Sequence, residues 1–77
     1  MRIAYDHEVD ALTISFRDVP ATSKRLAEGI AADYDEQGRL VGLEILDAIR
    51  RFGDATTLRQ VVIEGLGPGN GAQRKTA

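Results

Sequence analysis

The chain has 77 residues, no cysteine, and 10 basic against 12 acidic side chains, which gives a net charge of −2. This length allows one small domain, the lack of cysteine excludes disulfides and thiolate metal sites, and the slight acidity gives no general attraction to nucleic acid or anionic membranes. No apolar run approaches the roughly 20 residues that a membrane-spanning helix needs, and alternation begins at the N-terminus, so we expect a cytoplasmic protein.

The first 17 residues are expected to form a β-hairpin. In the segment ALTISFR, the apolar residues Leu12, Ile14 and Phe16 alternate with polar ones, and RIAYD alternates in the same way. This period of two is typical of strands with one buried face. The polar stretch DHEVD between the two segments is expected to form the turn, and DVPATSK after them a loop.

A second hairpin is predicted from the segments RLAEGIAADY and LVGLEIL, with its turn at residues 36–39. A slip of one residue would bury Asp33 and Glu44, so the hydrophobic pattern fixes the register. That register pairs Asp35 with Leu40, Tyr34 with Val41, Asp33 with Gly42, Ala32 with Leu43, Ala31 with Glu44, and Ile30 with Ile45.

The segment DAIRRFG changes to a helical period. Asp47 is a good N-cap, Ile49 and Phe52 share a helix face, and Gly53 is a good stop, so one short helix is predicted to cover one side of the sheet. Residues 57–64 are ambiguous, because their β-branched residues favour a strand while the spacing of their apolar residues also fits a helix. We predict a fifth strand there.

These elements define a small α+β domain. Its antiparallel sheet consists of two successive hairpins and the candidate fifth strand, with the short helix packed on it. The domain is expected to span residues 1–66. Residues 67–77 are rich in glycine and polar residues, so we expect a flexible C-terminal tail.

The string DYDEQGRLVGLE, residues 33–44, nearly matches the calcium loop of an EF-hand. Such a loop needs helices on both sides, whereas its flanks here are rich in strand formers. We therefore interpret it as a hairpin turn in which Gly38 takes a positive φ angle and Asp35 accepts hydrogen bonds. Metal binding by Asp33 and Glu44 remains the alternative.

The acidic turn around His7 raises the same question. Asp6, Glu8 and Asp10 match no complete metal-binding motif, so a solvated turn is favoured over a metal site. The chain contains one histidine and no nucleophile motif, so we expect no enzymatic activity and assign no catalytic, cofactor-binding or metal-ligating residue.

Several leucines are expected on the outer face of the second hairpin. In the predicted register Leu40 and Leu46 lie beside Glu44, and Leu26 adds to them. Apolar side chains grouped on an outer face indicate that something covers it: the helix, the C-terminal segment or another protein chain. We expect a homodimer or a partner protein rather than a nucleic acid, with these interface candidates: Leu26, Leu40, Glu44, Leu46, Arg50 and Arg51.

Two blocks together, YDHEVDALTISF and GIAADYDEQGRLVGLEILDA, resemble the small bacterial family known as domain of unknown function 2283 (DUF2283, YuzE-like). The resemblance covers roughly the first 52 residues. It implies a compact α+β domain with an antiparallel sheet, no established catalytic activity and no known cofactor. Some relatives accompany toxin-like partners, which implies that an antitoxin-type binding role is conceivable. The matching acidic and glycine residues coincide with turns and strand pairs, so we interpret most of them as fold-defining.

Overall fold

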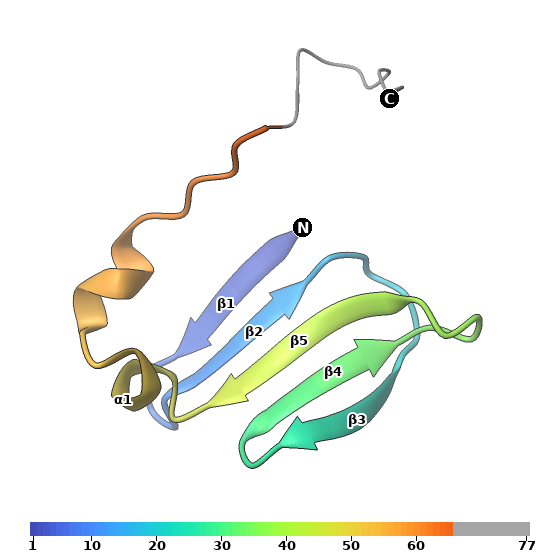
Figure 1. Cartoon of the computed structure of the whole chain (residues 1–77), viewed down its shortest axis with the longest axis horizontal. Coiled ribbons are helices and arrows are strands. Elements are labelled where there is room, and N and C mark those ends of the chain that lie inside the picture. The colour runs from blue at the N-terminus through green and yellow to red at the C-terminus, as the bar shows by residue number, and fades with distance from the viewer. Residues whose placement is uncertain (66–77) are drawn as a thin grey trace.

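The computed structural model describes residues 1–65 of the chain. The predicted C-terminal tail, residues 67–77, lies outside the described residues. Five strands form one antiparallel sheet (Figure 1), with the order β1-β2-β5-β4-β3. The strands are β1 (Arg2–Asp6), β2 (Ala11–Ser15), β3 (Thr22–Ala27), β4 (Ile30–Tyr34) and β5 (Leu40–Leu46).

Two short helices follow β5: the α-helix α1 (Ala48–Phe52) and the 3-10 helix η1 (Ala55–Arg59). They lie at the end of the sheet where β1 and β5 finish (Figure 1). The expectation that the helix covers one side of the sheet was wrong. A helix of five residues is only about 7.5 Å long, whereas a strand of seven residues is about 24 Å long. Neither helix in the described part of the chain is long and apolar enough to cross a membrane.

The third predicted strand is in fact a hairpin. Gly29 has a φ of 77°, and with Glu28 it forms a two-residue turn between Ala27 and Ile30. A positive φ costs glycine little, so the chain reverses here instead of continuing. The five strands therefore come from residues 2–46. The fifth strand predicted at residues 57–64 does not form, because η1 takes up its first part and residues 60–65 pair with no strand of the described chain.

The predicted register between β4 and β5 is confirmed over four pairs and wrong at the turn end. Ile30, Ala31, Ala32 and Asp33 oppose Ile45, Glu44, Leu43 and Gly42, as the hydrophobic pattern requires. Tyr34, however, opposes Leu40 rather than Val41, because the register shifts by one residue after Asp33. Val41 becomes the extra residue of a bulge, and its carbonyl oxygen accepts the Phe16 N–H at 2.8 Å.

The register separates two faces of the sheet, because directly paired residues place their side chains on the same face. One face, called the apolar face here, carries two rows across all five strands, and Tyr34 and Leu40 extend it. Its rows are Ile3, Ile14, Leu43, Ala32 and Lys24, and Tyr5, Leu12, Ile45, Ile30 and Ala27. The other, polar face carries rows of Arg2, Ser15, Gly42, Asp33 and Ser23, and of Ala4, Thr13, Glu44, Ala31 and Arg25.

The core of the described domain is small. Its buried apolar residues are Leu12, Ala32, Val41 and Ala48, and within residues 1–65 no large side chain is fully buried. Most side chains of the apolar face are only partly covered by their neighbours. Within residues 1–65 the domain is a single layer of sheet with a short helical end, so no second layer from this part of the chain covers most of its apolar face.

Candidate functional site

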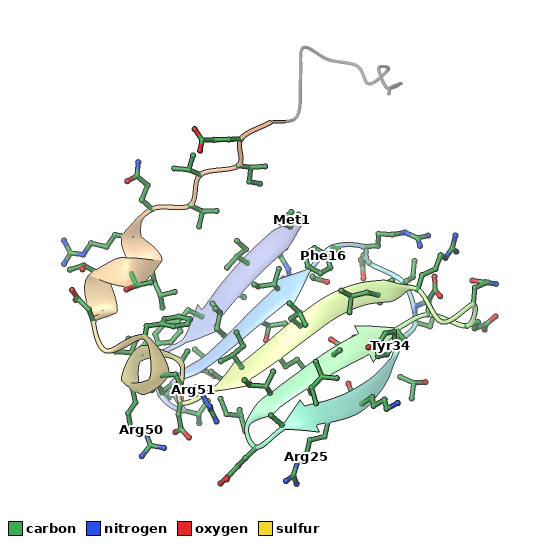
Figure 2. All side chains as sticks on the ribbon, in the orientation of Figure 1. Met1, Phe16, Arg25, Tyr34, Arg50 and Arg51 are labelled. Atoms are coloured by element: carbon green, nitrogen blue, oxygen red, sulfur yellow. The ribbon has the colours of Figure 1, made fainter. Side chains whose placement is uncertain are left out.

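The apolar face is the most prominent surface of the molecule. In the part of the chain that the structure describes, no helix lies over the middle of the sheet (Figure 1). Side chains stand along all five strands, with Phe16 and Tyr34 towards the end opposite α1 (Figure 2). Ile3, at the β1 edge, is an exposed large apolar residue. Large contiguous apolar patches are uncommon on the surface of soluble monomers, so this face is the candidate site of the described chain.

The leucines predicted as interface residues do not form one patch. Leu40 and Leu46 lie at opposite ends of β5, and their side chains are 46% and 53% exposed. Leu40 opposes Tyr34 and so belongs to the apolar face, whereas Leu46 opposes Ala11 and belongs to the polar face. Leu26 is exposed at the bulge in β3. The bulge at Val41 is the reason that the predicted common face for Leu40 and Leu46 was wrong.

The two arginines predicted as interface residues, Arg50 and Arg51, make contacts within the chain. Arg50 forms an exposed ion pair with Asp47 at 3.1 Å. Arg51 donates from Nε to the Leu46 carbonyl oxygen at 2.8 Å, and its other nitrogen donates to the Glu28 carbonyl oxygen. Its guanidinium lies over Gly29, where a Cβ atom would collide with it. Arg51 therefore ties α1 to the end of β5 and to the β3–β4 turn.

Asp10 holds the start of α1 from 39 positions away in the sequence. Its Oδ1 accepts the Ile49 N–H at 2.9 Å and the Tyr5 hydroxyl at 2.7 Å, and its carbonyl oxygen accepts the Ala48 N–H at 2.9 Å. The hydrogen bonds to its carboxylate, first that from Ile49 and then that from Tyr5, lower the pKa of Asp10. The predicted N-cap, Asp47, makes no side-chain cap and takes a left-handed conformation instead. The acidic turn thus connects the first hairpin to the start of α1. Within the turn, the Asp6 carboxylate accepts the Glu8 N–H.

Asp35 organises the turn that resembled a calcium loop. Its Oδ1 accepts the N–H groups of Gln37 and Arg39, each at 2.9 Å, and its Oδ2 pairs with the Arg39 Nε at 2.9 Å. The backbone hydrogen bond from Arg39 is the main cause that lowers the pKa of Asp35. Gly38 has a φ of 79°, as predicted for the turn. Both flanks are strands, so the interpretation as a hairpin is confirmed.

A second polar cluster lies on the polar face of the sheet. The Ser23 hydroxyl lies within hydrogen-bond distance of Asp33 Oδ1 and, at 3.1 Å, of Glu44 Oε2. Gly42 leaves room for the Asp33 carboxylate, because a Cβ atom there would lie 2.8 Å from Asp33 Oδ2. A hydrogen bond shared with Asp33, together with partial burial, raises the pKa of Glu44. The two carboxylates are thus close together, although the sequence placed them apart on an extended ladder.

This pair offers few ligands for a cation. Calcium takes six to eight oxygens, and zinc sites combine several nitrogen, sulfur or oxygen ligands. Among residues 1–65, no group of three or more histidine, cysteine, aspartate or glutamate side chains is arranged to hold a metal ion. Within this cluster, the Ser23 hydroxyl lies within hydrogen-bond distance of both the Asp33 and the Glu44 carboxylate. The arrangement is suited to fixing β3, β4 and β5 together.

Sequence reasoning missed the open apolar face and the β1 edge beside it. The alternating pattern shows which side chains share a face, but it does not show whether the same chain covers that face. One signal was present, because a helix of five residues is too short to cover five strands. A signal for the β1 edge is present in the composition, since β1 carries charges only at its two ends, Arg2 and Asp6.

Comparisons place the chain in a family without assigning it an activity. No curated protein and no solved structure matches it. A family model described as a protein of unknown function (DUF2283) matches residues 2–48, which include all five strands and the first residue of α1. The matched region also contains Asp10, Asp35 and the Asp33–Glu44 pair, which connect these elements. The chain belongs to the DUF2283 family.

Proposed function

We propose that this chain is a non-enzymatic protein-interaction module that forms a homodimer through the apolar face of its sheet. The observation that carries the proposal is the combination of a small core with a five-stranded apolar face that no second layer covers in residues 1–65. Small domains commonly gain stability from a partner subunit. A second copy supplies a surface of the same kind and size.

The area of the face suits an interface at the small end of the biological range. Strands of five to seven residues make a face of roughly 20 by 24 Å, or about 480 Å², from the usual rise and strand spacing. Two stacked faces then remove roughly 1,000 Å² from water, which is the lower bound for a specific interface. Face-to-face packing of two sheets about 10 Å apart is a common way to build a β-sandwich.

The chemistry of the two faces supports the choice of the apolar one. Isoleucine and leucine fill its centre, and the one charged residue in its two rows, Lys24, lies at the β3 edge. Interfaces usually combine an apolar centre with a polar rim. The polar face instead carries the hydrogen-bonded carboxylates of Asp33 and Glu44, which stacking would remove from water at a cost.

The test compares the same substitution on neighbouring residues of one strand. Ile14 and Thr13 lie side by side in β2, the first on the apolar face and the second opposite Glu44 on the polar face. Sedimentation equilibrium over a range of concentrations should show a dimer for the unchanged chain and for Thr13→Lys, and a monomer for Ile14→Lys. Circular dichroism confirms that each variant folds. A folded chain that stays monomeric at all concentrations, or equal dissociation of both variants, would contradict the proposal.

A further inference from the structure

The two edges of the sheet differ in how they are protected against pairing. The edge strand β3 carries Lys24 and Arg25, and its register shifts between Arg25 and Ala27. Charged side chains, lysine above all, and bulges are among the devices by which proteins block an open edge. β1 carries charges only at its two ends, Arg2 and Asp6, and pairs with β2 over five residues without a shift. Within residues 1–65 no strand pairs with the outer edge of β1, so the uncharged middle of that edge is open to another strand.

Residues 60–65 form a segment with the character of a strand that pairs with no other strand in the described part of the chain. Gln60 has extended backbone angles, and residues 60–65 continue beyond η1 (Figure 1). Val61, Val62 and Ile63 are each more than half exposed, and the segment joins no sheet within residues 1–65. Three β-branched residues in a row favour a strand. In extended form, Val61 and Ile63 point to one side and Gln60, Val62 and Glu64 to the other.

We infer that residues 60–64 of one copy add a sixth strand to the β1 edge of a second copy. The inference rests on the proposed self-association and specifies a second contact within that dimer. The alternation of the segment matches that of β1, in which Ile3 and Tyr5 face one side and Arg2, Ala4 and Asp6 the other. The antiparallel register that follows pairs Arg2 with Glu64, Ile3 with Ile63, Ala4 with Val62, Tyr5 with Val61, and Asp6 with Gln60.

Charge selects this orientation over the parallel one. The antiparallel register places the Arg2 guanidinium opposite the Glu64 carboxylate, and opposite charges on facing residues stabilise a strand pair. A parallel register that keeps the apolar residues together would place Asp6 opposite Glu64, and these like charges repel each other. The antiparallel strand also extends the apolar face with Val61 and Ile63, next to Ile3 and Tyr5.

Residues 60–65 do not pair with the β1 edge of their own chain. Asp10 fixes the start of α1 by two hydrogen bonds, and Arg51 fixes the helix to Leu46 and Glu28. Beyond this anchored helix, residues 60–65 join no sheet within residues 1–65, and Val61, Val62 and Ile63 are exposed. A second copy offers the same β1 edge to them. In a twofold-symmetric dimer each copy gives one segment and receives one, so both open edges are filled.

Engineered cysteines test the exchange in the full chain, which has no cysteine of its own. Ala4→Cys and Val62→Cys place the two thiols on directly opposed residues, whose Cα separation falls in the range that a disulfide requires. The two single variants, carrying different tags, are mixed and oxidised gently, and the double variant is oxidised alone. Each single variant by itself measures background cross-linking, and sedimentation of the reduced proteins measures the dimer independently.

We expect a covalent heterodimer from the mixture, joined between positions 4 and 62, and a covalent dimer from the double variant. A disulfide within one monomer would overturn the inference, because the segment would then close its own sheet. A dimer by sedimentation without this cross-link would overturn the inference and leave the proposed function standing. A folded monomer without any cross-link would overturn both.

Charge reversal tests the register. Arg2→Glu and Glu64→Arg should each weaken self-association by about 2- to 25-fold, because a symmetric dimer contains two such pairs. The double variant Arg2→Glu/Glu64→Arg should recover most of the loss. Without that recovery the register is wrong, whether the single variants weaken the dimer or leave it unchanged.

Discussion

Leu40 and Leu46 give a matched test of the faces of the sheet, because they are the same residue type at opposite ends of one strand. Their exposed fractions are similar, 46% and 53%. The bulge at Val41 pairs Leu40 with Tyr34 on the apolar face, whereas Leu46 pairs with Ala11 on the polar face. Without the bulge, both leucines would lie on the polar face and should behave alike.

The expected effect of Leu40→Ala on the dimer follows from its exposure. Full burial of a leucine is worth about 1.5–3 kcal/mol, so covering the 46% that is still exposed adds about 0.7–1.4 kcal/mol per copy. A symmetric dimer contains two copies, which gives about 1.4–2.8 kcal/mol. Because about 1.4 kcal/mol is a factor of ten, the dissociation constant should rise roughly 10- to 100-fold.

The assay is sedimentation equilibrium of Leu40→Ala, Leu46→Ala and the unchanged chain. Leu46→Ala should leave the dissociation constant almost unchanged. Both variants lose a similar share of buried leucine within the monomer, so urea unfolding should show comparable losses of monomer stability for the two. If the two leucines weaken the dimer equally, or if only Leu46 matters, the assignment of the interface to the apolar face is refuted.

The remaining predictions concern the polar contacts. The pKa of Asp10 is lowered in the folded state, so Asp10 stabilises the fold above its unfolded pKa, and this stabilisation is lost as pH falls through the folded pKa. Asp10→Asn should therefore reduce the dependence of stability on pH in the acid range, measured by circular dichroism. The raised pKa of Glu44 acts oppositely, with a contribution lost as pH rises, so Glu44→Gln should remove that loss in urea titrations at several pH values. Gly42→Ala places a Cβ atom 3.0 Å from the Ile14 carbonyl oxygen and should destabilise the fold by about 1–3 kcal/mol in urea unfolding. Calorimetric titration with calcium, magnesium, manganese and zinc should show no binding with a micromolar dissociation constant. Micromolar binding that Asp33→Asn abolishes would show that Asp33 belongs to a metal site.

Local chemistry made the strands and one turn predictable. Period-two alternation placed the strand segments, and four of the predicted β4–β5 pairs are present because any slip would move Asp33 and Glu44 to the apolar face. The aspartate before Gly38 identified the turn for a reason that the structure confirms, since Asp35 accepts two backbone N–H groups there. In both cases the decisive interactions join residues that are close in sequence or share one hairpin.

The errors arise where the decisive partner is distant in sequence or the local signal is weak. Glu28–Gly29 is a weak turn signal, so the sequence predicts a single strand where the structure has the β3–β4 hairpin. The cap of α1 comes from Asp10 rather than from Asp47, which precedes the helix. At the Val41 bulge, the carbonyl oxygen accepts from Phe16, which directly follows the neighbouring strand β2. The hydrophobic periodicity of the sequence predicts none of these contacts.

In the described part of the chain, the uncovered apolar face and the unpaired segment of residues 60–64 complement each other. Stacked faces alone reach only the lower bound of a specific interface, so a dimer held by them would be weak. A strand of five residues added to each sheet widens each face by about 4.8 Å over about 17 Å and places Val61 and Ile63 on it. It also provides hydrogen bonds for backbone groups at the open edge of β1. The proposed association would therefore extend the buried area, fill the open edge of β1, and give residues 60–64 the strand structure that their composition favours.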